Sequence, residues 1–262
     1  MNQHLDLTYH QSTLRLINEQ SIFSGHALEV LDHLERERNI VFPASVREWY
    51  SLTRRVDILG EYSNTDHPTP LEELGKVDRY WSGGKYHDID FLSRGLLIIM
   101  SENQGVWTWA IRLDGSDDPP VVVAFDTLMP FSTWEPCADT FSTFVYTRVW
   151  DHQIMFSGCV LFGSEPVLSS TDLRFLKEHF TEGPQTYTCP QLFNYRFSDG
   201  SKRMLLYEGE RSTDWYLRAE SEEELLHLTK AVWKCGTLEK SLESWTPCGN
   251  QVLAKMRDKS LL

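Results

Sequence analysis

His87, Asp88 and Asp90 form the densest group of side chains in this sequence that could do chemistry. An imidazole and two carboxylates within four residues have the donor types that bind a divalent metal or share a proton. A metal site needs further ligands from elsewhere in the chain, and the sequence identifies none. A short polar segment between a helix and a strand has the same composition, so an enzyme that uses these three residues is a secondary hypothesis.

Cys137 and His152 are a second possible combination, of a nucleophile and a base. Nothing in the sequence brings them together, and free cysteines are usually small core residues. The sequence has no Gly-rich phosphate loop, no H-E-x-x-H helix, no paired Cys/His zinc spacing and no G-x-S-x-G elbow. We therefore expect no catalytic residues, no bound metal and no cofactor.

Two further groups of acidic residues have local structural explanations. Asp114, Asp117 and Asp118 lie in a turn-forming segment, where Asp side chains bond to the nearby backbone. The run of three Glu at 222–224 falls in the first turn of a predicted helix, where anions offset the positive end of the helix dipole. Neither group requires a ligand.

The elements that must position these residues begin with helices. Leu28, Leu31 and Leu34 recur at helical spacing and predict an amphipathic helix over 26–38. A second helix is expected to begin at Pro43, with Val46, Trp49 and Tyr50 on one face. A third is expected from Thr69 as cap and Pro70 at the first position, with Glu72 completing a capping box and Leu71, Leu74 and Val77 facing inward.

Strands follow in the middle of the chain. Residues 95–100, 106–113 and 121–125 are short runs rich in branched and aromatic side chains, joined by links of turn size. They predict an antiparallel meander in which the second strand has one wet or shallow face. Residues 139–150 are then expected to form a closing helix, with Phe141 and Phe144 on its apolar side.

The remaining residues repeat this order without repeating the sequence. A helix is predicted over 171–180 with Ser170 as its cap, strands on both sides of the Asp199-Gly200 turn, and a strand over 214–219. Ser221 and Glu224 form a capping box at the start of another helix. Residues 158–166 could be a link or a strand.

These patterns indicate an α+β fold in which an antiparallel sheet is flanked by helices and is followed by a second, smaller α+β portion. We expect one domain over 1–150 and the second portion over 151–262. Whether the two portions share one core is left open.

Charge separates the two portions and limits the choice of partner. The 262 residues contain 25 basic and 38 acidic side chains, a net charge of −13. Residues 1–150 contain 12 basic and 22 acidic side chains, a net of −10, whereas 151–262 contain 13 and 16, a net of −3. An acidic surface repels phosphate backbones, so we expect no direct nucleic-acid binding. The same negative field steers basic partners, although it also serves solubility.

The termini and the cysteines suggest a compartment. The N-terminal residues lack the basic and apolar regions of a signal peptide, and the most apolar run, 96–100, is far shorter than the roughly 20 residues that cross a bilayer. The five cysteines are widely spaced and include no C-x-x-C pair. The odd number and the spacing favour reduced thiols, so we expect a soluble cytoplasmic protein that does not bind membranes.

Residues from about 25 to 150 resemble the SUKH superfamily, on an ordered set of short motifs. An acidic helix precedes Phe42-Pro43-Ala44-Ser45, which is similar to the family's L-P-x-S helix start, and Thr69-Pro70-Leu71-Glu72 is similar to its second helix entry. The segments 102–107 and 118–121 resemble its central strands, and 140–144 resembles its closing F-x-x-F helix. The chain departs from the family at 52–56, which replace the usual Asn-Gly-Gly, so the turn there must differ.

The resemblance implies an α+β domain that binds another protein and does no chemistry. Family members include bacterial immunity proteins of toxin systems, whose partners are often nucleases, and fungal regulators of cell-wall synthesis. We therefore expect an immunity-type protein that neutralises a basic toxin, with a regulatory or scaffolding protein as the alternative. The oligomeric state is left open. Candidate partner-binding residues, chosen on charge and loop position, are Glu61, Asp66, Asp88, Asp90, Asp117 and Asp118.

Overall fold

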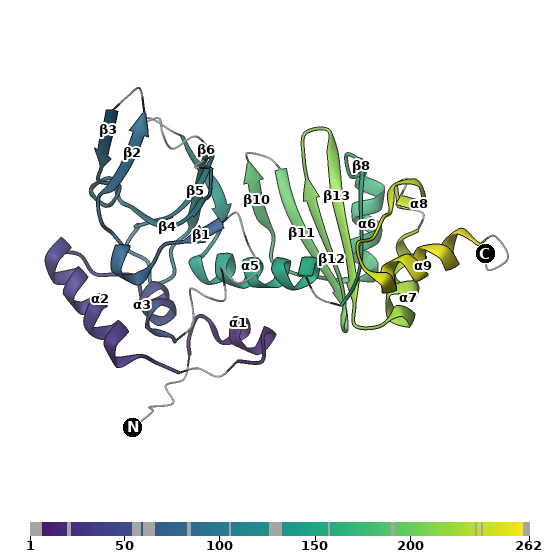
Figure 1. Ribbon diagram of the computed structural model, residues 1–262, viewed down its shortest axis with the longest axis horizontal. Helices are drawn as coiled ribbons and strands as arrows, with labels where there is room; N and C mark the ends of the chain where they lie inside the picture. The colour runs from purple at the N-terminus through teal and green to yellow at the C-terminus, as the bar shows by residue number, and fades with distance from the viewer. Residues whose placement is uncertain are drawn as a thin grey trace. The chain divides into compact units, whose positions relative to one another are not determined.

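The computed structural model describes residues 7–19, 22–53, 59, 66–82, 85–104, 106–125, 133–156, 158–189, 192–233, 235–236 and 238–258. The chain divides into two compact units, residues 1–149 (unit 1) and 150–262 (unit 2). Each unit contains helices and an antiparallel sheet (Figure 1), so the predicted α+β class is confirmed.

Unit 1 begins with the helices α1 (Gln11–Leu16), α2 (Gly25–Arg38) and α3 (Ala44–Ser51). Helix α2 starts where the Ser24 side chain accepts a hydrogen bond from the amide of Ala27, and it ends at Asn39, whose φ of 51° is left-handed. The predicted helix over 26–38 is therefore confirmed. Helix α3 follows Pro43, which is its N-cap rather than its first residue.

The strands that pair with one another on the sheet of unit 1 are β1 (Asp66–Pro68), β4 (Leu96–Glu102), β5 (Trp107–Arg112), β6 (Val121–Phe125) and β7 (Trp134–Ala138), in the order β1-β4-β5-β6-β7. All neighbouring pairs are antiparallel, as predicted for β4, β5 and β6. Alternate residues point to opposite faces. Trp109 and Ile111 therefore pack with the helices α2, α3 and α5 (Phe141–Phe156) in the main core of the unit.

The opposite face of this sheet holds a second, small cluster around Ile98, Ala110 and Val122, to which Ile89 and Phe91 contribute. The face of β5 that was predicted to be wet or shallow is therefore covered, and Thr108 and Ala110 are only 1% and 0% exposed. Ile89 ends a hairpin that the sequence did not predict, formed by β2 (Asp78–Ser82) and β3 (Lys85–Ile89), with the short 3-10 helix η2 (Leu92–Arg94) after it.

The third predicted helix is wrong. Only a single 3-10 turn, η1 (Leu71–Glu73), forms there, and no side chain caps it. Gly75 follows with a φ of +73°, a left-handed conformation that suits glycine and that ends the turn. Leu71 and Leu74 are buried as predicted, but Val77 is 47% exposed.

Helix α5 closes unit 1 and continues beyond it. Phe141, Phe144, Val145 and Val149 are buried in the main core, as the sequence predicted. The helix does not end at Trp150 but runs to Phe156, so its last two turns belong to unit 2.

Unit 2 is built on a sheet in the order β10-β11-β12-β13-β8, with β9 paired to β11 (Figure 1). Its strands are β8 (Cys159–Pro166), β9 (Thr181–Glu182), β10 (Thr186–Cys189), β11 (Leu192–Asp199), β12 (Lys202–Glu208) and β13 (Ser212–Ala219). The open choice for residues 158–166 is thus decided in favour of a strand. β11 and β12 meet at the predicted Asp199-Gly200 turn.

One face of this sheet is covered by α6 (Ser170–His179), α7 (Glu222–Val232), α8 (Leu238–Ser241) and α9 (Pro247–Arg257), which share a single apolar core with it. Ser221 accepts a hydrogen bond from the amide of Glu224 at the start of α7, which confirms that cap. Helix α6 is capped by Ser169 rather than by the predicted Ser170. Helix α9 was not predicted, although Thr246 caps it and Pro247 is its first residue.

The other face of the sheet holds a buried ion pair with the end of α5. Arg196 of β11 and Asp151 of α5 are 2% and 5% exposed. The guanidinium donates from Nε to Oδ1 at 2.7 Å and from Nη2 to Oδ2 at 2.6 Å. Its Nη1 reaches the carbonyl of Pro184 at 3.0 Å, and the hydroxyl of Tyr207 donates to Asp151 at 3.2 Å. Every charged atom is thereby hydrogen-bonded, which buried charges require.

Candidate functional site

We call four carboxylates near the base of the β2–β3 hairpin in unit 1 the hairpin-base acids: Glu73, Asp78, Asp88 and Asp90. The charges of Glu73 and Asp90 act on Asp78, whereas Asp88, one residue before the strand partner of Asp78, points to the opposite face of the hairpin. Asp78 opens β2 and pairs in register with Ile89, between the two acids that the sequence singled out on and after β3. Glu73 is the last residue of η1. Strand pairing therefore places Asp78 beside β3, where the sequence had identified only Asp88 and Asp90.

Asp78 is the electrostatically strained member of this group. Burial, together with the charges of Glu73 and Asp90, raises the pKa of this carboxyl to about 6. No described residue forms an ion pair with it. A group whose charge is opposed by burial and by like neighbours is a candidate for contact with a cation from another molecule.

The other hairpin-base acids have partners of unequal strength. Asp90 accepts a hydrogen bond from Nη2 of Arg38 at 2.7 Å, and this pair ties the end of α2 to the hairpin. Asp88 lies 3.7 Å from Nε of Arg79, with both side chains about 70% exposed, so the pair contributes little and leaves Asp88 open to solvent.

Two of the predicted contact residues hold unit 1 together. Asp66 of β1 pairs with Arg148 of α5, and the Arg148 guanidinium also lies 5.3 Å from the ring centre of Trp109. Asp118 accepts hydrogen bonds from the amide and the hydroxyl of Ser142, at 3.0 and 2.5 Å, in the first turn of α5. Their position is explained by the fold, as is that of Asp90, whereas no described residue forms an ion pair with Asp78.

The remaining predicted residues differ in what the structure says of them. The Asp117 side chain is exposed, and its backbone carbonyl accepts a hydrogen bond from the amide of Ser45 at 2.9 Å. Glu61 lies outside the described residues. These candidates therefore do not form one continuous group in the described part of the chain.

The two catalytic hypotheses gain no geometric support. The side chain of His87 lies outside the described part, Asp88 is exposed, and Asp90 is engaged by Arg38. Cys137 belongs to unit 1 and His152 to unit 2. Among the described residues, no group of three or more His, Cys, Asp or Glu side chains is arranged to hold a metal ion.

The prediction that all cysteines are reduced is wrong. Cys159 at the start of β8 forms a disulfide with Cys248 in the first turn of α9. The two residues are 89 positions apart, and a separation of that size gives no local signal of pairing. Cys137 and Cys235 are buried and do not take part in this disulfide. The side chain of Cys189 is not part of the described structure.

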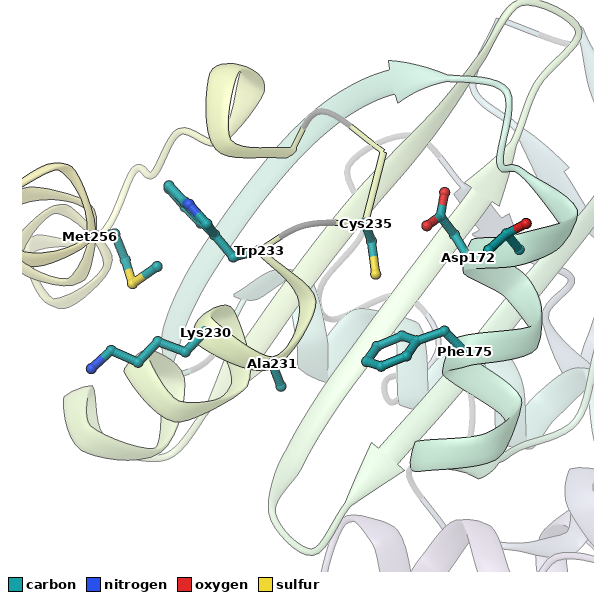
Figure 2. A pocket seen from close by; sticks show the side chains of 8 residues that line it. Asp172, Phe175, Lys230, Ala231, Trp233, Cys235 and Met256 are labelled. Carbon is teal, nitrogen blue, oxygen red and sulfur yellow. The ribbon is translucent and has the colours of Figure 1, made fainter. Parts of the chain in front are cut away.

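A mainly apolar cavity of about 430 Å³ lies between α6 and the ends of α7 and α9 (Figure 2). Phe175, Trp233 and Met256 supply most of its wall, and the sulfur of Cys235 points into the space above Phe175. Burial, with a smaller contribution from the charge of Asp172, raises the pKa of this thiol to about 12. The thiol is therefore protonated at neutral pH and is a poor nucleophile.

Asp172 at the edge of this cavity is occupied by structural contacts. Its carboxylate accepts hydrogen bonds from the hydroxyl of Ser169 at 2.6 Å and from the amide of Gly236 at 3.3 Å. It thus holds the start of α6 against the segment that follows α7. The cavity is an apolar space, and its polar edge is already engaged.

Unit 1 is an α+β domain in which a helix-covered antiparallel meander presents an acidic hairpin base. Residues 27–147 match the SMI1/KNR4 family (SUKH-1), which confirms the predicted resemblance to the SUKH superfamily. The match covers most of unit 1 and none of unit 2. No curated protein and no solved structure matches the chain significantly.

This family match supports a protein-binding role, of immunity or regulatory type. No helix among the described residues is both long and apolar enough to cross a membrane.

Proposed function

We propose that the protein binds a basic protein partner through unit 1, catalyses no reaction, and acts as an immunity-type protein that neutralises a toxin in the cytoplasm. The family match over residues 27–147 carries this proposal, because immunity proteins of toxin systems belong to the SUKH superfamily. The excess of acidic residues in the first 150 positions, a net charge of −10, agrees with a basic partner.

The hairpin-base acids are the preferred contact surface. Asp88 is exposed, and Asp78 is a half-buried carboxylate surrounded by like charges. A lysine or arginine from a partner placed at this point would lower the free energy of Asp78 as well as its own. The association would be fast and would weaken as salt concentration rises.

A nuclease toxin fits this chemistry. A nuclease holds a phosphate backbone in a basic cleft, and an acidic protein surface can occupy the same cleft. Blocking would then need no chemistry on the side of the immunity protein, only a complementary charge and shape.

The test is co-expression of the full chain with the toxin encoded beside its gene, followed by measurement of binding between the purified proteins. The double variant Asp78→Asn/Asp88→Asn is expected to weaken binding by about tenfold, since each removes one charge at the contact. The matched control Glu29→Gln/Asp139→Asn removes two exposed charges elsewhere on unit 1 and is expected to change affinity less than twofold. Cell death despite well-expressed protein, or equal losses in the two variants, would contradict the proposal.

A regulatory or scaffolding role is the second candidate, favoured by unit 2. This unit has its own core, lies outside the family match and carries little of the negative charge. A second binding surface there would let the chain join two proteins. Light scattering of the full chain, alone and with each partner, distinguishes a two-protein complex from a ternary one.

A further inference from the structure

Register places three side chains in one row on the edge of the sheet in unit 2. Tyr216 of β13 is directly opposite Phe162 of β8. Phe162 in turn forms an isolated antiparallel bridge with Glu243, with amide-to-carbonyl distances of 3.0 and 2.7 Å. Residues directly opposite each other point to the same face, so Tyr216, Phe162 and Glu243 lie side by side on one surface.

Trp245 completes an aromatic platform beside this row. Its ring centre lies 4.5 Å from that of Phe162 with an angle of 27° between the planes, and 6.5 Å from that of Tyr216. Trp245 is nevertheless 51% exposed, and no other Trp among the described residues is in the exposed class. The Trp245 ring is thus stacked on its neighbours while much of the residue remains in water. Packing of the core does not explain this exposure.

Two carboxylates border the platform. Asp214 lies opposite Ser164 in the same β13–β8 register, two residues from Tyr216, and therefore on the same face. Together with Phe162, Tyr216 and Glu243 it lines a hollow of about 500 Å³, and none of the described residues that line it is Lys or Arg. No described residue forms an ion pair with Asp214 or Glu243. Burial and the charge of Asp214 also raise the pKa of Tyr216, so this phenol stays neutral.

The chemistry of this hollow selects its ligand. An exposed indole attracts a cation to its face, and a carboxylate beside it accepts hydrogen bonds from the same cation. A guanidinium is planar and can stack on a ring while it donates in its own plane, which an ammonium cannot do. A neutral or anionic ligand would leave both carboxylates without a counter-charge.

We propose that this aromatic–acidic hollow, lined by Phe162, Asp214, Tyr216 and Glu243 with Trp245 stacked beside it, binds an arginine side chain of a protein partner. The guanidinium stacks on the indole of Trp245 and donates to the carboxylate of Glu243 or Asp214. This site lies in unit 2, apart from the family match, so it goes beyond the proposed function of unit 1. It gives the chain a second recognition surface with a defined side-chain preference.

The test is calorimetric titration of the full-length protein with a blocked hexapeptide that contains two arginines between glycines. The same peptide with lysine or with citrulline in place of arginine measures the contributions of planarity and charge. Trp245→Ala is expected to weaken binding of the arginine peptide by about tenfold or more, because it removes the stacking surface. Glu243→Gln is expected to weaken it by about three- to tenfold.

Glu210→Gln is the matched control, since it removes one exposed charge of unit 2 outside the hollow. It is expected to leave affinity within about twofold, because screened charges at a distance contribute little. Asp78→Asn in unit 1 is expected to behave like the control, which separates this proposal from the function proposed for unit 1. Equal binding of the citrulline peptide, or equal losses in Glu243→Gln and Glu210→Gln, would overturn the proposal. If Trp245→Ala unfolds, Trp245→Leu with Glu243→Gln provides the same comparison.

Discussion

Replacement of Arg196 by Met is expected to destabilise unit 2 more than any single change on its surface. Met has a similar length and no charge, so the variant removes the guanidinium while it keeps most of the buried volume. Asp151 would lose the two hydrogen bonds that Arg196 donates. Of the hydrogen bonds described above, the one from the hydroxyl of Tyr207 would remain. The Asp151 carboxylate, which is only 5% exposed, would then be a buried charge without its counter-charge.

Breaking one partner of a buried ion pair costs about 3–5 kcal/mol, because the remaining charge cannot be solvated. The double variant Asp151→Leu/Arg196→Met removes both charges and fills the space with apolar atoms. Such replacements are often neutral or even stabilising. The double variant is therefore expected to be more stable than Arg196→Met by about 2 kcal/mol or more, which reports coupling between the two side chains.

Urea unfolding, followed by tryptophan fluorescence and by far-ultraviolet circular dichroism, measures these differences. Lys177→Met is the control, because its ion pair with Glu182 is partly exposed and is expected to contribute less than about 1 kcal/mol. Two results would refute the reasoning. One is a loss of less than about 1 kcal/mol in the free energy of unfolding of Arg196→Met. The other is a loss in the double variant that equals the sum of the losses in Arg196→Met and in Asp151→Leu.

Three further changes test other contacts. Replacing Cys159 and Cys248 by Ser is expected to lower the stability of unit 2 by about 2–5 kcal/mol, since the disulfide closes a long loop, and reductant should have the same effect on the unmodified chain in urea unfolding. Burial lowers the pKa of His10, so the unfolded chain binds a proton at this residue more readily than the folded chain does. The free energy of unfolding is therefore unaffected above the ordinary histidine pKa of about 6.5 and falls as the pH drops below that value. His10→Gln is expected to flatten this pH dependence in a series of melting curves. Asp118→Ala is expected to cost about 1 kcal/mol because it removes a cap from α5, against less than about 0.5 kcal/mol for the exposed Asp117→Ala, and equal melting temperatures would contradict this assignment.

The parts of the fold that the sequence predicted are those with strong local signals. The apolar spacing of α2, the branched residues of β4, β5 and β6, and the cap at Ser221 each act within a few residues, and the structure confirms all of them. The family resemblance, which depends on the order of such local motifs, is confirmed for the same reason.

The two Thr-Pro segments mark where local signals stop being sufficient. Thr69-Pro70 was expected to start a helix, but the amide of Thr69 donates to the carbonyl of Ile99 in extension of the β1–β4 pairing, and only one 3-10 turn follows. Thr246-Pro247 has the same pattern and does start a helix, where Val252 and Met256 find a core. Tertiary packing decides between the two outcomes.

The candidate sites were predictable only in composition. Asp88 and Asp90 were identified from their charge, but the acid that matters most beside them, Asp78, depends on the β2–β3 pairing, which the sequence did not predict. Arg196 lies between Tyr195 and Phe197 in an alternating strand, where a polar residue normally faces water. It is buried because α5 is longer than its apolar pattern indicated, and no signal near Arg196 reports that length.

The extra turns of α5 also limit how this chain can be divided by recombination. A crossover at the end of the family match, near residue 147, would pass Asp151 to the downstream piece together with Arg196. A crossover after Phe156, at the end of the helix, would leave the buried guanidinium of Arg196 without the Asp151 carboxylate that accepts two of its hydrogen bonds. A gene fusion that borrows unit 2 must therefore take the tail of the preceding helix with it.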